Sequence, residues 1–154
     1  MNNRSWEELK QIKSCGVFFL SEAIFVVAAA RTVPGFEIDS EPAFKLDRRT
    51  PPSKLGDVIV TALNSHRIDV LVPDTGSNQV SPLLEITGMK SWNELEHAAT
   101  HVSIRLDQGI VRVIPTARDP RHGGYVHLPD QAFECADQPQ DIGNTVLAML
   151  ERCS

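Results

Sequence analysis

Hydrophobic side chains recur along the chain with two periods, one typical of helices and one typical of strands. In residues 51–65 and 139–152, mostly apolar positions fall at i, i+3, i+4, i+7 and i+8, so they line one face of a helix. The two stripes are Leu55, Val58, Ile59, Ala62 and Leu63, and Ile142, Thr145, Val146, Met149 and Leu150. Residues 17–20 and 23–30 are almost continuously apolar, which predicts a hairpin buried on both faces of a sheet.

The second half contains a hairpin of another kind. Residues 102–106 alternate apolar and polar side chains, and residues 110–115 return after a turn, which predicts strands with one wet face. Short helices are predicted over residues 5–13, near 83–84 and over 92–100, and further strands over 44–47, 67–72, 125–128 and 132–136. Residues 32–42 contain two prolines and a glycine, and we expect a loop or an edge segment there.

The two halves of the chain share residues in the same order. Ser91–Leu95 (SWNEL) repeats Ser5–Leu9 (SWEEL), and these two motifs contain both tryptophans of the chain. Each motif predicts a helix start, because the Ser hydroxyl can cap the first turn and the Glu three residues later can reach back to the cap. The pairs GF at 35–36 and AF at 43–44 recur, equally spaced, as GY at 124–125 and AF at 132–133.

The long helices share two further positions. Pro52 matches Pro139, and Gly56 matches Gly143. A glycine inside a helix costs roughly 1 kcal/mol relative to alanine. A glycine at the same place in both helices therefore predicts close backbone packing, most simply of helix against sheet.

The summed pattern is an α-ββ-ββ-α unit that occurs twice. It predicts a single α+β domain spanning residues 1–154, with a mainly antiparallel, twisted sheet and helices packed on it. The two pseudo-repeated units would cover about residues 5–65 and 91–153, joined by a connector over residues 66–90.

Charge and cysteine content narrow the class of function. The formal net charge of −5 disfavours nucleic acid as a partner and suits a basic protein. The three cysteines, Cys15, Cys135 and Cys153, are far apart, which indicates reduced thiols in the cytoplasm. Residues 1–10 are polar and charged, so we expect no signal peptide, and the apolar stretch 16–30 is too short to span a membrane.

Two constellations could in principle carry catalysis. His97 and His101 are spaced as two zinc ligands on one helix face would be, but a third ligand is not evident and the Glu of a zinc-protease helix is absent. Asp119, His122 and Cys135 could be an acid, a base and a nucleophile, but their spacing matches no nucleophile elbow, and Cys135 is expected in the core. We therefore predict no catalytic, metal-binding or cofactor-binding residue, no cofactor, and a protein that is not an enzyme.

Two aromatic residues and five acidic residues are candidates for contacts with a partner. Trp6 and Trp92 could stack on bases, but their place in the repeated motif predicts that they pack the short helices on the sheet. The acidic candidates are Glu37, Asp39, Glu41, Asp69 and Asp74. The alternative interpretation of these carboxylates is a solvated acidic surface without a partner.

A series of short motifs gives the chain a family resemblance. They are DSEP at 39–42, FKLD at 44–47, KLG at 54–56, ALNSHR at 62–67, Pro73, PLL at 82–84, GMKSW at 88–92, and the helix that begins near Ile142 and ends near Cys153. In this order the chain resembles, over about residues 16–154, immunity proteins of bacterial contact-dependent growth inhibition systems. The resemblance implies an α/β sandwich-like domain. It also implies a cytoplasmic protein that binds the C-terminal toxin domain of an effector, often a nuclease, and blocks it.

Toxin-contacting surfaces differ between members of that family, so the resemblance assigns no contact residue. Our first hypothesis is a non-enzymatic immunity protein that forms a one-to-one complex with its cognate toxin domain and occludes the active site. Its acidic residues would steer a basic toxin, and an edge strand could pair with a strand of the toxin. The alternatives are a single-stranded nucleic-acid-binding module, which the net charge disfavours, and a metal-dependent enzyme that uses His97 and His101.

Overall fold

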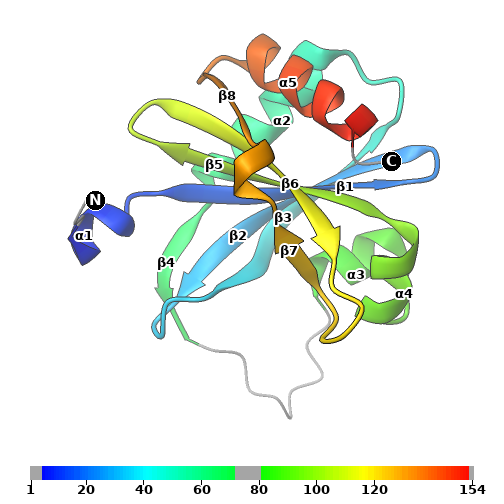
Figure 1. Ribbon diagram of the computed structural model, residues 1–154, viewed down its shortest axis with the longest axis horizontal. Helices are drawn as coiled ribbons and strands as arrows, with labels where there is room; N and C mark the ends of the chain where they lie inside the picture. Colours follow the sequence, from blue (N-terminus) through cyan, green and yellow to red (C-terminus); the bar gives the residue numbers. More distant parts are fainter. Residues whose placement is uncertain (1–4, 72–80, 153–154) are drawn as a thin grey trace.

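The computed structural model describes residues 5–71 and 81–152. Within these residues, eight strands form one mainly antiparallel sheet, and five α-helices accompany it (Figure 1). The α+β fold class predicted from the sequence is confirmed.

Two antiparallel hairpins form the centre of the sheet. The first consists of β1 (Lys13–Leu20) and β2 (Ala23–Thr32), and the second of β5 (Thr100–Asp107) and β6 (Ile110–Arg118). They join through an antiparallel pairing of β1 with β5. The predicted hairpins are therefore correct, and the apolar one has a strand in the middle of the sheet because its side chains are buried on both faces.

The remaining strands complete both ends of the sheet, whose main order is β3-β2-β1-β5-β6-β7. At one end, β3 (Glu37–Asp47) runs antiparallel to β2, and β4 (Arg67–Val70) pairs in parallel with the C-terminal part of β2. At the other end, β7 (Tyr125–His127) and β8 (Phe133–Ala136) pair with opposite ends of β6.

The helices lie on both faces of this sheet. Their bounds are α1 (Trp6–Leu9), α2 (Pro52–Asn64), α3 (Pro82–Thr87), α4 (Trp92–Ala98) and α5 (Pro139–Arg152), with a 3-10 turn at Pro129–Gln131. The long helices α2 and α5 lie side by side on one face, and α3 and α4 lie on the other (Figure 1).

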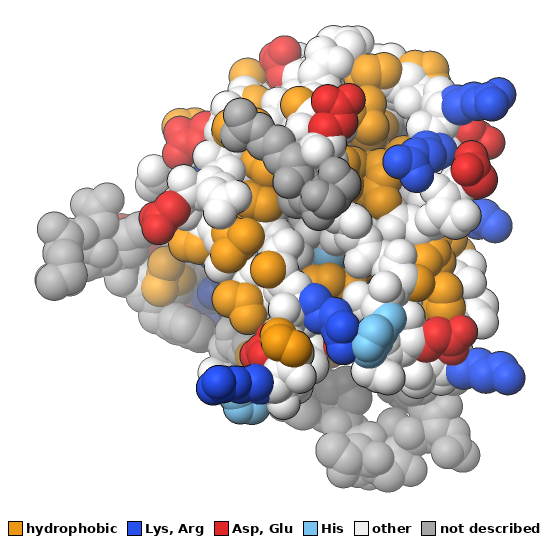
Figure 2. Space-filling model, turned by 45° about the vertical axis from the view of Figure 1, so that its right-hand side comes forward, with side chains coloured by type: hydrophobic (Ala, Val, Ile, Leu, Met, Phe, Trp, Pro, Cys, Tyr) orange, Lys and Arg blue, Asp and Glu red, His pale blue; other side chains and the backbone are white. Residues whose placement is uncertain are grey.

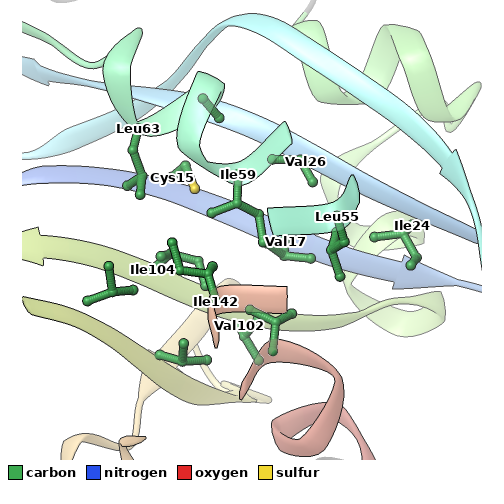
Figure 3. Packing of buried hydrophobic residues seen from close by; sticks show 14 of the residues in the cluster. Cys15, Val17, Ile24, Val26, Leu55, Ile59, Leu63, Val102, Ile104 and Ile142 are labelled. Carbon is green, nitrogen blue, oxygen red and sulfur yellow. The ribbon is translucent and has the colours of Figure 1, made fainter. Parts of the chain in front are cut away.

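The larger core lies between the sheet and the pair α2 and α5. Alternate side chains of the central strands, such as Val17, Val26 and Ile104, meet the helical stripes there (Figure 3). Leu55 and Ile142 show no exposed surface, as their stripe positions predicted. Burying a side chain of this size contributes about 1.5–3 kcal/mol to folding, so this face of the sheet supplies most of the apolar stabilisation.

A smaller core occupies the opposite face. Phe18, Phe25 and Val27 point away from α2 and α5 and pack against Leu83 of α3 and Leu95 of α4. Each short helix is thus anchored by one fully buried leucine. This second core fixes α3 beside β3, which matters for the site described below.

The structure corrects two expectations and decides between two alternatives in a third. The contact made by Gly56 and Gly143 is between the helices α2 and α5, not between helix and sheet, because each glycine faces the first turn of the other helix. Residues 37–47 form β3 at the edge of the described sheet, so of the two possibilities expected for residues 32–42, a loop or an edge segment, the edge segment is correct from Glu37 onward. Trp92 is 41% exposed, and it is Leu95 of the same helix that packs in the core between α4 and the sheet. The expectation that Trp92 packs the helix on the sheet is therefore wrong. The side chain of Trp6 is not among the described parts of the structure. The pseudo-repeat itself stays an interpretation of the sequence.

Candidate functional site

The acidic residues predicted to contact a partner lie mainly on β3, which is an edge strand of the described sheet. Glu37 is opposite Arg31 of β2, and its Oε1 atom is 3.3 Å from Nη2 of that arginine. The two side chains are 27% and 14% exposed, so the pair is partly shielded from water. Glu37 therefore presents a carboxylate whose charge is compensated within the protein.

Asp39 connects β3 to the start of α3. The Ser81 hydroxyl donates to Oδ2 of Asp39 at 3.5 Å, and the same Ser81 oxygen accepts the N–H of Leu83 at 3.2 Å as the cap of α3. Burial raises the pKa of Asp39 to about 6, although the bond from Ser81 acts in the opposite direction. Asp39 is thus a partly buried acid that positions a helix cap.

Glu41 is exposed and borders a hollow between β3 and α3. Six residues line the hollow, which has a volume of about 420 Å³: Glu41, Pro42, Ala43, Pro82, Glu85 and Ile86. Glu85 is exposed as well. The sequence did not single out this second carboxylate, and the weak signal for it was its place in the first turn of a short predicted helix.

Asp69 lies on β4, on the other side of β2 from β3. Its Oδ2 atom is 3.4 Å from Nζ of Lys10, which also lies 3.7 Å from Glu7. The β2 strand therefore separates Asp69 from Glu37, Asp39 and Glu41. Asp74, the fifth predicted residue, lies outside the described residues.

Charged side chains of both signs are spread over the part of the surface seen in Figure 2, with hydrophobic side chains between them. The candidate acids do not form one continuous group, because Glu37 is paired with Arg31 and Asp69 lies on the other side of β2. What the structure brings together is a smaller unit, in which Glu41 and Glu85 face one hollow and Asp39 supports its wall through Ser81.

The two histidines considered as zinc ligands are not on one helix. The helix α4 ends at Ala98, and His101 lies on β5, where its ring contacts Phe18 and Tyr125 at centroid distances of 4.4 and 4.8 Å. Burial, with a smaller effect of His127, lowers the pKa of His101 to about 3. Among residues 5–71 and 81–152, no group of three or more His, Cys, Asp or Glu side chains is placed to hold a metal ion.

Asp119, His122 and Cys135, the other candidate catalytic set, do not come together in the structure. Asp119 accepts the N–H groups of Arg121 and His122 in the loop after β6, and its Oδ2 lies 3.3 Å from Nδ1 of His122. Cys135 lies on β8, opposite Val111, at the far end of β6. Burial raises the pKa of the Cys135 thiol, which is the opposite of what a thiolate nucleophile needs.

Comparisons with known proteins find similar folds but no sequence family. No protein-family model matches the chain, and no curated protein matches it. None of the helices in the described ranges has the length and apolar character that crossing a bilayer requires.

Two solved structures are similar over almost the whole chain. A protein of unknown function, NMB0488 from Neisseria meningitidis, matches with a TM-score of 0.72 at 18% identity, covering 94% of this chain and 97% of that one. A chain of the CdiA-CT/CdiI toxin and immunity complex from Yersinia pseudotuberculosis matches with a TM-score of 0.71 at 15% identity, covering 94% and 98%. The chain therefore has the same fold as a component of a toxin and immunity complex.

Proposed function

We propose that this protein is an immunity protein, which binds and neutralises the C-terminal toxin domain of a contact-dependent growth inhibition effector. It acts in the cytoplasm, as one partner of a one-to-one complex, and has no enzymatic activity. The observation that carries the proposal is the fold shared over 94% of the chain with a component of a toxin and immunity complex. The resemblance of the sequence motifs to this family supports the same conclusion.

Inhibition follows from occlusion of the toxin active site. A net charge of −5 favours encounter with a basic domain, as expected for a nuclease toxin that binds nucleic-acid phosphates. The acids Glu37, Asp39 and Glu41 on β3 are the toxin-facing residues at one side of β2, and Asp69 and Asp74 are those in or after β4. In addition, β3 is an edge strand of the sheet that the described residues form, and a strand of the toxin could pair with it.

The test is a titration of the purified protein with the toxin domain encoded directly upstream of its gene. Calorimetry should give a one-to-one complex of nanomolar affinity, and toxin activity should be lost at equimolar protein. Absence of heat, with the toxin still active, would contradict the proposal. Tight binding of single-stranded nucleic acid at low salt would instead favour the binding-module alternative.

A triple variant tests the role of the acids on β3. Replacement of Glu37, Asp39 and Glu41 by alanine should slow association and weaken its dependence on salt, because charge steering acts on the encounter step. Association kinetics equal to those of the wild type would remove these residues from the interface.

A further inference from the structure

The hollow between β3 and α3 combines apolar walls with two acids. Pro42 and Ala43 come from β3, and Pro82 and Ile86 come from α3, so the walls are rings and aliphatic carbon. Glu41 and Glu85 border the same hollow from opposite elements. Such a combination suits a guest with a carbon stem and a charged end.

The charges at the hollow are uncompensated. Within residues 5–71 and 81–152, the carboxylates of Glu41 and Glu85 have neither a hydrogen bond nor an ion pair. In contrast, the carboxylate of Glu37 forms an ion pair with Arg31, and that of Asp69 forms one with Lys10. The hollow is therefore the place along β3 and α3 where an incoming cation finds two acceptors that the protein itself does not use.

The walls are also held in place before a partner arrives. Ser81 caps α3 and donates to Asp39 of β3, and Leu83 anchors the helix in the smaller core with no exposed surface. Two of the lining residues are prolines, whose backbone is restricted. A preformed hollow loses little conformational entropy on binding, which favours a specific contact over a loose one.

We propose that this hollow receives an arginine or lysine side chain of the toxin domain. The stem of the side chain packs on Pro42, Pro82 and Ile86, and its cationic end lies between Glu41 and Glu85. Arginine fits best, because its planar guanidinium can donate to two carboxylates at once. The inference rests on the proposed function and specifies the chemistry of one contact within it.

The experiment measures binding kinetics of the full protein with the upstream-encoded toxin domain. The variant is Glu41→Gln with Glu85→Gln, which keeps the shape of the hollow and removes both charges. Because a shielded charge pair acts mainly on complex lifetime, dissociation should accelerate on the order of tenfold or more. Its thermal stability should equal that of the wild type, since both carboxylates are exposed and unpaired.

The matched control is Asp57→Asn with Asp141→Asn, which removes two exposed carboxylates from α2 and α5 on the other face of the sheet. It changes the net charge equally, so any general loss of attraction appears in both variants. Its dissociation rate should stay at the wild-type value. If the two double variants dissociate alike, the hollow does not bind a cationic side chain, whereas failure of the wild type to form a complex would instead overturn the proposed function.

Discussion

Gly56, in the second turn of α2, lies directly against the carbonyl group of Pro139 in the first turn of α5. A Cβ atom at position 56 would overlap that carbonyl, and one at Gly143 would overlap the carbonyl of Pro52 in the first turn of α2. The two helices thus touch main chain to main chain at two reciprocal points. Proline suits both first turns, because the N–H it lacks would have no partner inside the helix there.

The first prediction is that Gly56→Ala and Gly143→Ala each destabilise the protein. The new methyl group meets main chain, which no rotamer change can move, and such overpacking costs about 1–3 kcal/mol or more. The better helix propensity of alanine, about 1 kcal/mol, offsets part of this cost. Urea denaturation should show a lower midpoint for each variant with an unchanged slope.

Asn144→Ala is the control, because Asn144 is exposed and adjacent to Gly143 on the same helix. Its stability should stay within about 0.5 kcal/mol of the wild type. The Gly56→Ala/Gly143→Ala double variant should lose less than the sum of the single losses, since separation of the helices at one point relieves the other. Full stability of either single variant would show that the helices can separate without cost.

The fold was predictable where side-chain periodicity is strong. The stripes of α2 and α5 and the continuous apolar run of β2 determine which faces are buried, and the structure buries them. Residues 37–42 were harder, because a proline and three acids are as typical of a loop as of an edge strand. They form a strand because β2 offers them a pairing partner, which is tertiary information that local pattern does not contain.

The candidate site was predictable only in part. Glu41 was named because acids cluster in that stretch, but Glu85 is far away in sequence and meets it only when α3 docks on β3. The pairing of Glu37 with Arg31 likewise depends on strand register. The sequence pattern can thus identify charged candidate residues, but which of them are neutralised by an ion pair depends on tertiary contacts.

A second prediction concerns the partly buried Asp39. Its pKa is about 6 in the folded protein, because of burial, and 3.8 is the ordinary value expected in the unfolded chain. The folded state therefore holds the proton more tightly, so this group makes stability fall as pH rises from about 4 to about 6. Asp39→Asn should remove that decline, measured by urea denaturation across this range. An identical pH profile for variant and wild type would mean that Asp39 ionises as it does in the unfolded chain.

A third prediction concerns His101, whose effect has the opposite sign. The Thr116 hydroxyl donates to the His101 carbonyl, so Nδ1–H of the ring is the donor toward Oγ1 of Thr116 at 3.1 Å. The pKa of His101 is lowered from 6.5 to about 3, chiefly by burial, so this residue makes stability fall as pH drops from about 6.5 toward 3. His101→Phe should flatten this acid-side loss.

The measurement for His101 is the ring-proton NMR shift followed between pH 7 and 4. In the folded protein the shift should stay constant over this range, because the imidazole remains neutral. Titration near pH 6 would show that the ring is accessible to water. Since Asp39 and His101 act in opposite directions between pH 4 and 6, the single variants are needed to separate them.

The last prediction separates a compensated from an uncompensated acid on one strand. Glu37→Gln and Glu41→Gln change the net charge equally, but only Glu37 lies beside an arginine. Glu41→Gln should slow association with the toxin domain, because its free charge also steers the encounter, in addition to the faster dissociation expected from the hollow, and should leave stability unchanged. Glu37→Gln should affect association less, and should lower stability by at most about 1 kcal/mol, the usual worth of an exposed or partly exposed ion pair. Stopped-flow association at several salt concentrations, together with urea denaturation, measures both. If Glu37→Gln slows association as much as Glu41→Gln does, the ion pair with Arg31 of β2 does not weaken the attraction of Glu37 for the toxin, and charge compensation between strands does not determine which acids contact it.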